Sequence, residues 1–313
     1  MRETTFTLPA SDGTEVFARR WSPDDGVAPR AVMQVSHGMA EHGARYAPLA
    51  EAATARGIVV YASDHRGHGQ TIGPTNPRGH FADRDGWRLC LDDLNRVGDR
   101  ATQEHPGLPR VLFAHSMGSF MAQQLLFERG DQFAAVLLSG SSSGVSNPLA
   151  PIGRLVARVE RKRLGARTPS PLLTKLSFGT FNKPFEPART DFDWLSRDPA
   201  EVDKYIADPL CGFDVSTQLW VDLLDALPGL AKKENLARIP KATPLYVVSG
   251  SEDPVHTRMR GLKLLLRAYE DAGLRDVTWK VWSNARHEVL NETNRAEVIA
   301  HALDWVESRA LSR

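Results

Sequence analysis

The feature that most constrains the fold is a strand that turns sharply into a helix within residues 110–124. Val111–Ala114 is a short run of apolar, β-branched and aromatic residues, which is typical of a buried strand. From Ser119 onward the pattern is helical. The turn Ala114-His115-Ser116-Met117-Gly118 carries small residues two positions before and two positions after a serine. Such a tight turn excludes larger side chains at those two positions and pushes the Ser116 hydroxyl outward.

This turn resembles the nucleophile elbow Gly-x-Ser-x-Gly of α/β-hydrolases, with Ala114 in place of the first glycine. Seven other segments have strand patterns, and helical segments of 10–20 residues separate most of them, which predicts a mostly parallel sheet covered on both faces. The fold class is therefore α/β, an α/β-hydrolase fold with eight strands. The other strands are expected at Thr5–Leu8, Glu15–Trp21, Ala31–Ser36, Ile58–Ala62, Ala134–Ser139, Leu245–Gly250 and Val277–Trp282.

The alternation breaks between residues 141 and 235, which predicts an inserted cap over the strand ends. This stretch is rich in proline and lacks the rhythm of parallel strands. The predicted domains are a core formed by residues 1–140 and 236–313 and a mainly helical cap formed by 141–235. Residues 151–189 carry nine Lys or Arg and two Glu, whereas 190–234 carry four Lys or Arg and ten acidic residues.

One helical stretch in the basic half of the cap is amphipathic. A basic amphipathic helix either lies on an anionic membrane or packs as a solvated helix on its own protein. Peripheral membrane contact through the cap is therefore one of two expectations. The apolar residues are Ile152, Leu155, Val156 and Val159, and the basic ones are Arg154, Arg158, Arg161 and Arg163.

Composition limits the partners and the compartment. A net charge of +1 over 313 residues gives no overall attraction to nucleic acid, so no nucleic-acid partner is expected. Cys90 and Cys211 are far apart in the sequence and form no metal or redox motif, so a reduced, cytoplasmic compartment is expected. No signal-peptide pattern is visible, and no apolar run approaches the ~18–20 residues of a membrane-spanning helix. The oligomeric state stays open.

A serine attacks a carbonyl at neutral pH only with the help of a base that is oriented by an acid. In α/β-hydrolases the acid and then the histidine follow the serine along the chain. Asp253 comes after the strand Leu245–Gly250, and His287 comes after Val277–Trp282. Because the carboxyl ends of parallel strands meet at one edge of the sheet, both loops converge on Ser116. We predict Ser116 as nucleophile, Asp253 as acid and His287 as base.

Other residues compete for these roles. Glu252 adjoins Asp253 and is an alternative acid. His256 shares a loop with the acid and is poorly placed to reach the serine, and the side chain of His115 leaves the turn in another direction. The remaining histidines at strand ends are expected to hydrogen-bond loops, and no two have metal-ligand spacing, so neither metal nor cofactor is predicted. They are His37, His42, His65 and His68.

The developing oxyanion needs N–H donors. One is expected from Met117, the residue after the nucleophile, at the start of a helix whose dipole favours negative charge. The second is expected in the loop after Ala31–Ser36, and we assign it to the Met39 N–H.

The strand ends carry the motifs His37-Gly38-Met39-Ala40-Glu41-His42 with Arg45-Tyr46, Asp64-His65-Arg66-Gly67-His68-Gly69, His115-Ser116-Met117-Gly118, Asp253 and Arg286-His287-Glu288. Together they resemble the monoacylglycerol lipase/lysophospholipase family of serine hydrolases. The resemblance implies a mobile cap that forms an acyl-binding channel, and activity on esters with one long acyl chain. It also supports Ser116, Asp253 and His287 as triad and the Met39 and Met117 N–H groups as oxyanion donors.

The expected function is therefore hydrolysis of carboxylic esters of single-chain lipids, of monoacylglycerol or lysophospholipid type, through an acyl-serine intermediate. The substrate is a small-molecule lipid ester. Alternatives are a short-chain or xenobiotic carboxylesterase, an aminopeptidase, which needs acids to hold the substrate amine, and a non-catalytic binding protein on the same fold. Apolar cap residues are candidates for the acyl channel, although more than half are expected to be plain core: Leu149, Ile152, Phe178, Phe181, Leu210, Phe213 and Leu219.

Overall fold

The computed structural model describes residues 1–145, 150–257 and 259–311, and its sheet contains eight strands. They are β1 (Arg2–Pro9), β2 (Glu15–Ser22), β3 (Ala31–Ser36), β4 (Ile58–Ser63), β5 (Arg110–His115), β6 (Ala135–Ser139), β7 (Leu245–Gly250) and β8 (Val277–Trp282). Their spatial order is β1-β2-β4-β3-β5-β6-β7-β8. β2 is antiparallel to β1 and to β4, and the other neighbours are parallel. This confirms the predicted mostly parallel sheet, and β1 and β2 form an antiparallel hairpin at its edge.

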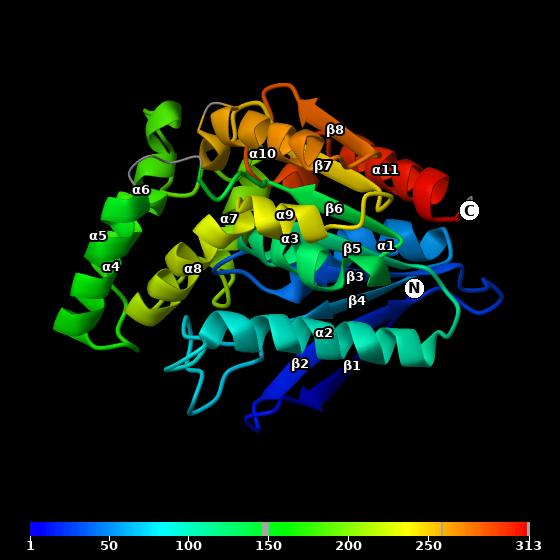
Figure 1. The fold of residues 1–313 in the computed structure, drawn as a ribbon, viewed down its shortest axis with the longest axis horizontal. Helices are drawn as coiled ribbons and strands as arrows, with labels where there is room; N and C mark the ends of the chain where they lie inside the picture. The colour runs from blue at the N-terminus through cyan, green and yellow to red at the C-terminus, as the bar shows by residue number, and fades with distance from the viewer. Residues whose placement is uncertain (146–149, 258, 312–313) are drawn as a thin grey trace.

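Helices cover both faces of this sheet (Figure 1). They are α1 (Ala47–Ala55), α2 (Gly86–Glu104), α3 (Met117–Arg129), α4 (Ala150–Leu164), α5 (Pro171–Leu176), α6 (Phe178–Phe181), α7 (Pro199–Ala207), α8 (Thr217–Leu230), α9 (Lys233–Arg238), α10 (Arg260–Asp271) and α11 (Arg295–Val306). Side chains of α2, α3, α9 and α10 form the cluster on one face, and those of α1 and α11 cover the other. The inner strands β3–β7 are consequently buried along their whole length.

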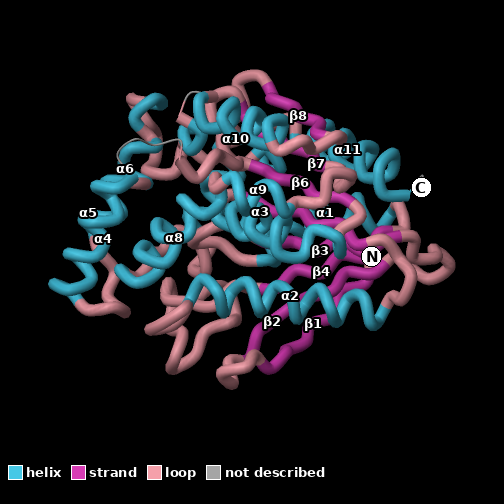
Figure 2. Tube along the Cα trace, viewed as in Figure 1, coloured by secondary structure: helices cyan, strands magenta, loops and turns pink. Residues whose placement is uncertain are grey.

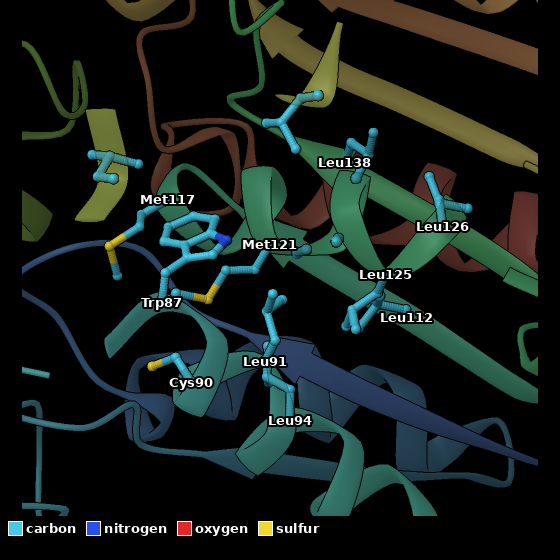
Figure 3. Close-up of a cluster of buried hydrophobic side chains, with 14 of the residues drawn as sticks. Trp87, Cys90, Leu91, Leu94, Leu112, Met117, Met121, Leu125, Leu126 and Leu138 are labelled. Atoms are coloured by element: carbon cyan, nitrogen blue, oxygen red, sulfur yellow. The ribbon is translucent and has the colours of Figure 1, made fainter. Parts of the chain in front are cut away.

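The apolar face of α2 packs against α3. Trp87, Leu91 and Leu94 are all buried, and they lie beside Met117 and Met121 of α3 (Figure 3). Complete burial of a side chain of this size contributes about 1.5–3 kcal/mol. The cluster therefore fixes the first turn of α3, which begins directly after Ser116.

The insertion between β6 and β7 carries α4 to α9. Figure 2 shows α4, α5 and α6 at one end of the molecule, beyond the ends of the parallel strands. Within the insertion α4 packs against α8, while α9 packs against α3. The predicted cap, residues 141–235, falls in this insertion, and its boundaries stay a prediction.

The turn from β5 into α3 explains why small residues flank the serine. Ser116 has φ 50° and ψ −120°, a backbone conformation that residues with a side chain rarely adopt. A Cβ at Gly118 would lie only 2.3 Å from the Ser36 carbonyl oxygen and 2.5 Å from that of His37. Ala114, by contrast, is completely buried and its methyl group belongs to the core. Alanine therefore fits the first small position, whereas the second requires glycine.

Replacing Gly118→Ala is expected to lower the free energy of unfolding by about 3 kcal/mol, the upper end of the cost of an added methyl group in a packed core. Both obstructing atoms are backbone oxygens, so no side-chain rotation relieves the clash. Thermal or urea unfolding measures the loss. Gly153→Ala is the matched control, because a Cβ in that part of α4 meets no atom within 4 Å. Equal stability of Gly118→Ala and the wild type would contradict this account of the turn.

Candidate active site

A cavity of about 420 Å³ opens beside Ser116, where the parallel strands end. The loops after β3, β5 and β8 supply its inner wall, with Gly38, Met39, His115 and His287. The insertion supplies its apolar outer wall, formed by Phe178, Phe192, Trp194, Leu195 and Phe213. The predicted nucleophile and the predicted base thus line one cavity that the insertion covers.

His287 and Asp253 form a buried pair between the ends of β7 and β8. His287 Nδ1 donates to Asp253 Oδ1 at 3.0 Å, and both side chains are almost completely buried. The Asp253 carboxylate also accepts the N–H of Val255 at 2.9 Å and the hydroxyl of Ser249 at 3.1 Å. Because Nδ1 is bound to the acid, Nε2 is the ring nitrogen left for proton transfer.

The charges of this pair stabilise each other. Burial raises the pKa of Asp253, but the charge and hydrogen bond of His287 outweigh burial and lower it to about 2. Burial lowers the pKa of His287, but the Asp253 carboxylate outweighs it and raises that pKa above its ordinary value. His287 is therefore a stronger base than a free imidazole.

The described residues contain no hydrogen bond between Ser116 Oγ and His287, although both side chains line the cavity. Catalytic hydrogen bonds of this kind often form only when substrate is bound. The loop after β6 limits the position of the ring, since a Cβ at Gly140 would lie 2.8 Å from His287 Cε1. The backbone of the same loop holds the elbow, where the Ser116 N–H donates to the Ser139 carbonyl at 2.9 Å.

An oxyanion can be bound only by N–H groups that do not already donate to another acceptor. The Gly38 N–H donates to Glu41 Oε1 at 2.5 Å and is therefore not available. In the described residues, the N–H groups of Met39 and Met117 have no hydrogen-bond acceptor. Met117 begins α3, where the helix dipole favours negative charge. Both are the residues that the sequence predicts as oxyanion donors, and that role stays a prediction.

The rival residues lie in other environments. Glu252 is exposed, and its carboxylate accepts the Ser251 hydroxyl at 3.2 Å. His256 Nε2 donates to the Gly250 carbonyl at 2.9 Å within its own loop. His115 lies 4.7 Å from His287 between ring centres, and Ser139 Oγ is 3.2 Å from its Nδ1. None of the three takes the place of His287 or Asp253.

The other strand-end histidines hydrogen-bond loops, as predicted. His37 Nδ1 pairs with the Gly38 carbonyl at 2.7 Å, and His68 Nδ1 pairs with that of Arg66 at 2.8 Å. The His65 backbone N–H donates to His37 Nε2 at 2.9 Å, and His65 Nε2 donates to the His37 carbonyl at 3.0 Å. Burial lowers the pKa of His65 to about 3 and of His68 to about 4, so both rings are neutral.

The predicted acyl-channel residues divide between cavity and core. Phe178 and Phe213 line the cavity. Leu219 is completely buried in the main core, whereas Ile152 is exposed on α4. Leu149 lies outside the described residues. Sequence hydrophobicity alone did not separate these environments, because the short helices of the insertion bury different faces.

Sequence analysis missed a buried ionic cluster behind the cavity. Arg45 lies between the carboxylates of Glu41 and Glu288, with N–O distances of 2.6 to 2.7 Å. The signal was present in the sequence, because Glu41 and Arg45 are four residues apart and Glu288 follows the predicted base. Only the fold shows that the two motifs meet.

Among the described residues, one group has potential metal-ligand atoms within 4.8 Å of one another: His42, Asp208 and Cys211. His42 Nε2 already pairs with Asp208 Oδ2 at 2.8 Å. Burial raises the pKa of the Cys211 thiol, which opposes the thiolate that a metal needs. The group therefore fits a polar contact between core and insertion better than a metal site.

Known proteins match nearly the whole chain. A family model described as "Serine aminopeptidase, S33" matches residues 27–294. A monoacylglycerol lipase of Mycolicibacterium smegmatis is 31% identical over 95% of this chain and 94% of its own length. A human monoglyceride lipase is 30% identical over 96% of this chain and 89% of its own.

Solved structures show the same fold. A thermostable carboxyl esterase from Bacillus coagulans superposes with a TM-score of 0.89, 24% identity and 99% coverage of both chains. A monoacylglycerol lipase of Paleococcus ferrophilus superposes with a TM-score of 0.70 and 22% identity, covering 94% of this chain and 99% of that one. The eight-stranded sheet, the family match and the lipase relatives agree: the chain belongs to the monoacylglycerol lipase family of α/β-hydrolases, which are carboxylic ester hydrolases.

Proposed function

We propose that the protein is a serine hydrolase that cleaves the esters of single-chain lipids in two acyl-transfer steps. Ser116 attacks the ester carbonyl while His287 takes its proton, and the alcohol leaves with that proton. Water activated by His287 then releases the fatty acid from the acyl-serine. The observation that carries the proposal is the buried His287–Asp253 pair at a cavity that it shares with Ser116 on a strained turn.

The cavity supports a substrate with an apolar chain. Its outer wall includes aromatic rings that pack together, and Phe178 lies 6.0 Å from Trp194 between ring centres. Trp194 in turn lies 5.1 Å from the His287 ring, so the apolar wall reaches the reacting centre. An acyl chain placed here leaves water, at a gain of about 0.8 kcal/mol per methylene. Relatives named as monoacylglycerol and monoglyceride lipases support the same substrate class.

The matching family model is described as a serine aminopeptidase, so aminopeptidase activity is the second candidate function. The acidic residues at the cavity make it the less favoured one. A substrate amine needs an unpaired acid, but Glu41 and Glu288 both pair with Arg45. Asp214 at the cavity accepts the Thr174 hydroxyl at 2.8 Å. Asp191, the remaining acid that lines the cavity, is exposed to solvent. Ester hydrolysis therefore fits these acids better.

A fluorophosphonate is expected to label Ser116 at a rate that rises with pH through the pKa of His287. That pKa is raised by Asp253, so the half-maximal rate falls above the ordinary imidazole value of about 6.5. Asp253→Asn is expected to lower the maximal rate by about 10⁴ and to shift the midpoint to lower pH, because the imidazolium loses its carboxylate. Peptide mass spectrometry identifies the labelled residue, and labelling quenched at a series of times gives the rate at each pH.

Glu252→Gln is the matched control, since this neighbouring acid is exposed. It is expected to keep the labelling rate and the pH midpoint of the wild type. Loss of labelling in Glu252→Gln together with retention in Asp253→Asn would assign the acid to Glu252 instead.

Substrate preference is expected to increase with acyl length among monoacylglycerols and lysophospholipids, and hydrolysis of aminoacyl-arylamides is expected to be absent. The kcat/KM values of a chain-length series on the purified protein test this. A preference for acetyl and butyryl esters would indicate a short-chain carboxylesterase. Cleavage of the arylamides would favour an aminopeptidase.

The outer face of α4 supports peripheral membrane contact. Ile152, Leu155 and Val159 are 60%, 64% and 56% exposed, whereas Ala157 and Glu160 are buried. The helix contacts the rest of the protein through Val156, Ala157 and Glu160, and the exposed Arg158 pairs with Asp225 of α8 at 3.0 Å. Leu172 and Leu176 of α5 are also exposed. Among the described residues, no helix has the length and hydropathy to cross a bilayer.

The triple variant Ile152→Ser, Leu155→Ser and Val159→Ser is expected to bind vesicles of zwitterionic and anionic phospholipid at least tenfold more weakly than the wild type. The reason is that three exposed apolar side chains are removed from the interface. Co-sedimentation measures the bound fraction. Ile206→Ser and Trp279→Ser, at exposed apolar positions elsewhere, are the controls. Unchanged binding of the triple variant would mean that this face does not touch the membrane.

A further inference from the structure

Arg45 is the centre of a buried cluster that no step of the proposed reaction uses. It lies in the short 3₁₀ helix Gly43–Tyr46, directly after the loop that carries Met39. Nη1 donates to Glu41 at 2.7 Å and to Glu288 at 2.6 Å, and Nη2 donates to the second oxygen of Glu288 at 2.7 Å. The side chains of Arg45, Glu41 and Glu288 are only 12%, 4% and 7% exposed. One guanidinium thus joins two buried carboxylates.

One of these carboxylates holds the loop of the predicted oxyanion donor. Glu41 Oε1 accepts the Gly38 N–H at 2.5 Å and the Tyr46 hydroxyl at 3.0 Å. Gly38 immediately precedes Met39, and the bond fixes the peptide on one side of it. The direction of the Met39 N–H therefore depends on the position of the Glu41 carboxylate.

The other carboxylate belongs to the residue after the predicted base. The Glu288 backbone N–H donates to the Leu195 carbonyl at 2.8 Å, and Asn291 Nδ2 donates to Glu288 Oε2 at 2.9 Å. Burial raises the pKa of Glu288, but Arg45 outweighs burial and lowers it to about 2, so the carboxylate is ionised. The bidentate geometry fixes both the distance and the plane of the Glu288 side chain.

The insertion also contacts this cluster. Tyr205 of α7 places its ring 4.8 Å from the Arg45 guanidinium, and its hydroxyl donates to the Ala40 carbonyl at 2.9 Å. Arg45 thus contacts the oxyanion loop, the loop of the base and the insertion.

We propose that Arg45 is a positioning residue that sets the distance between the Met39 N–H and His287 by joining Glu41 to Glu288. The two groups must reach the same tetrahedral centre, one at its oxygen and the other at the attacking hydroxyl. They come from loops more than 200 residues apart in the sequence, and this cluster is a direct ionic link between them. The inference rests on the proposed function only in taking Ser116 as the reacting residue.

The test measures the rate at which a fluorophosphonate labels Ser116 in Arg45→Ala, in Arg45→Lys and in the wild type. A displacement of about 1 Å in a catalytic group lowers rates by about 10²-fold, so a loss of this size is expected for Arg45→Ala. Arg45→Lys is expected to recover only part of it, because an ammonium group cannot bond both carboxylates in one plane. If Arg45→Ala does not fold, Arg45→Lys alone is expected to be at least about fivefold slower than the wild type.

Chemical rescue separates positioning from general stability. A second cavity of about 420 Å³ borders Arg45 and is lined by Tyr205, Asp208 and the exposed Lys204, which gives small ions a route. Millimolar guanidinium is expected to restore labelling of Arg45→Ala at least tenfold, because its planar fork bonds both carboxylates. Urea and ammonium, which lack that charge or that geometry, are expected to restore none.

Arg66 supplies a matched control. It is also buried and also joins two carboxylates, Asp12 and Asp93, with its shortest contacts at 2.6 Å, but it lines no part of the cavity. Arg66→Ala is expected to unfold at lower temperature, to be labelled at the wild-type rate when folded, and to show no rescue by guanidinium.

Three outcomes would overturn the proposal: labelling of folded Arg45→Ala within twofold of the wild type, no rescue by guanidinium, or an equal slowing in folded Arg66→Ala. Failure of the proposed function would give a different result from failure of the inference about Arg45. If the wild type is labelled at Ser116 but hydrolyses no lipid ester, the substrate assignment fails and the role of Arg45 stands. If the wild type is not labelled, both fail.

Discussion

The buried hydrogen bond between His287 and Asp253 is the interaction on which the rest of the site depends. It joins the loops after the last two strands of the sheet, and both groups are almost fully removed from water. A buried carboxylate without a partner is strongly destabilising, so the pair fixes the two loops relative to each other. The strained turn at Ser116 then places the remaining group at the same edge of the sheet.

The insertion does more than cover the cavity. The His287 backbone N–H donates to the Trp194 carbonyl at 3.4 Å, and the Ser196 hydroxyl donates to the Asn291 carbonyl at 2.8 Å. Arg197 Nε also pairs with the fully buried Glu292 at 2.8 Å. The segment around Trp194 is therefore part of the support of the base, whereas α4 contacts mainly α8.

Sequence reasoning recovered the sheet, the elbow and the pairing of His287 with Asp253, because each depends on local patterns or on chain order. It did not recover the Arg45 cluster or the exposure of the apolar side chains of α4, because both depend on partners distant in the sequence. The periodicity of α4 identified two faces correctly. It could not show that Ile152 and Leu155 stay exposed while Arg158 on the same helix pairs with Asp225 of α8.

The crystal structure of a phosphonate adduct tests most directly whether these groups converge on one reacting centre. The account predicts phosphorus bonded to Ser116 Oγ, and a phosphoryl oxygen about 2.7–3.1 Å from the N–H nitrogens of both Met39 and Met117. His287 Nε2 is then expected within hydrogen-bond distance of Ser116 Oγ or the adduct. A phosphonyl group on another residue, or an oxygen that contacts neither N–H group, would contradict it.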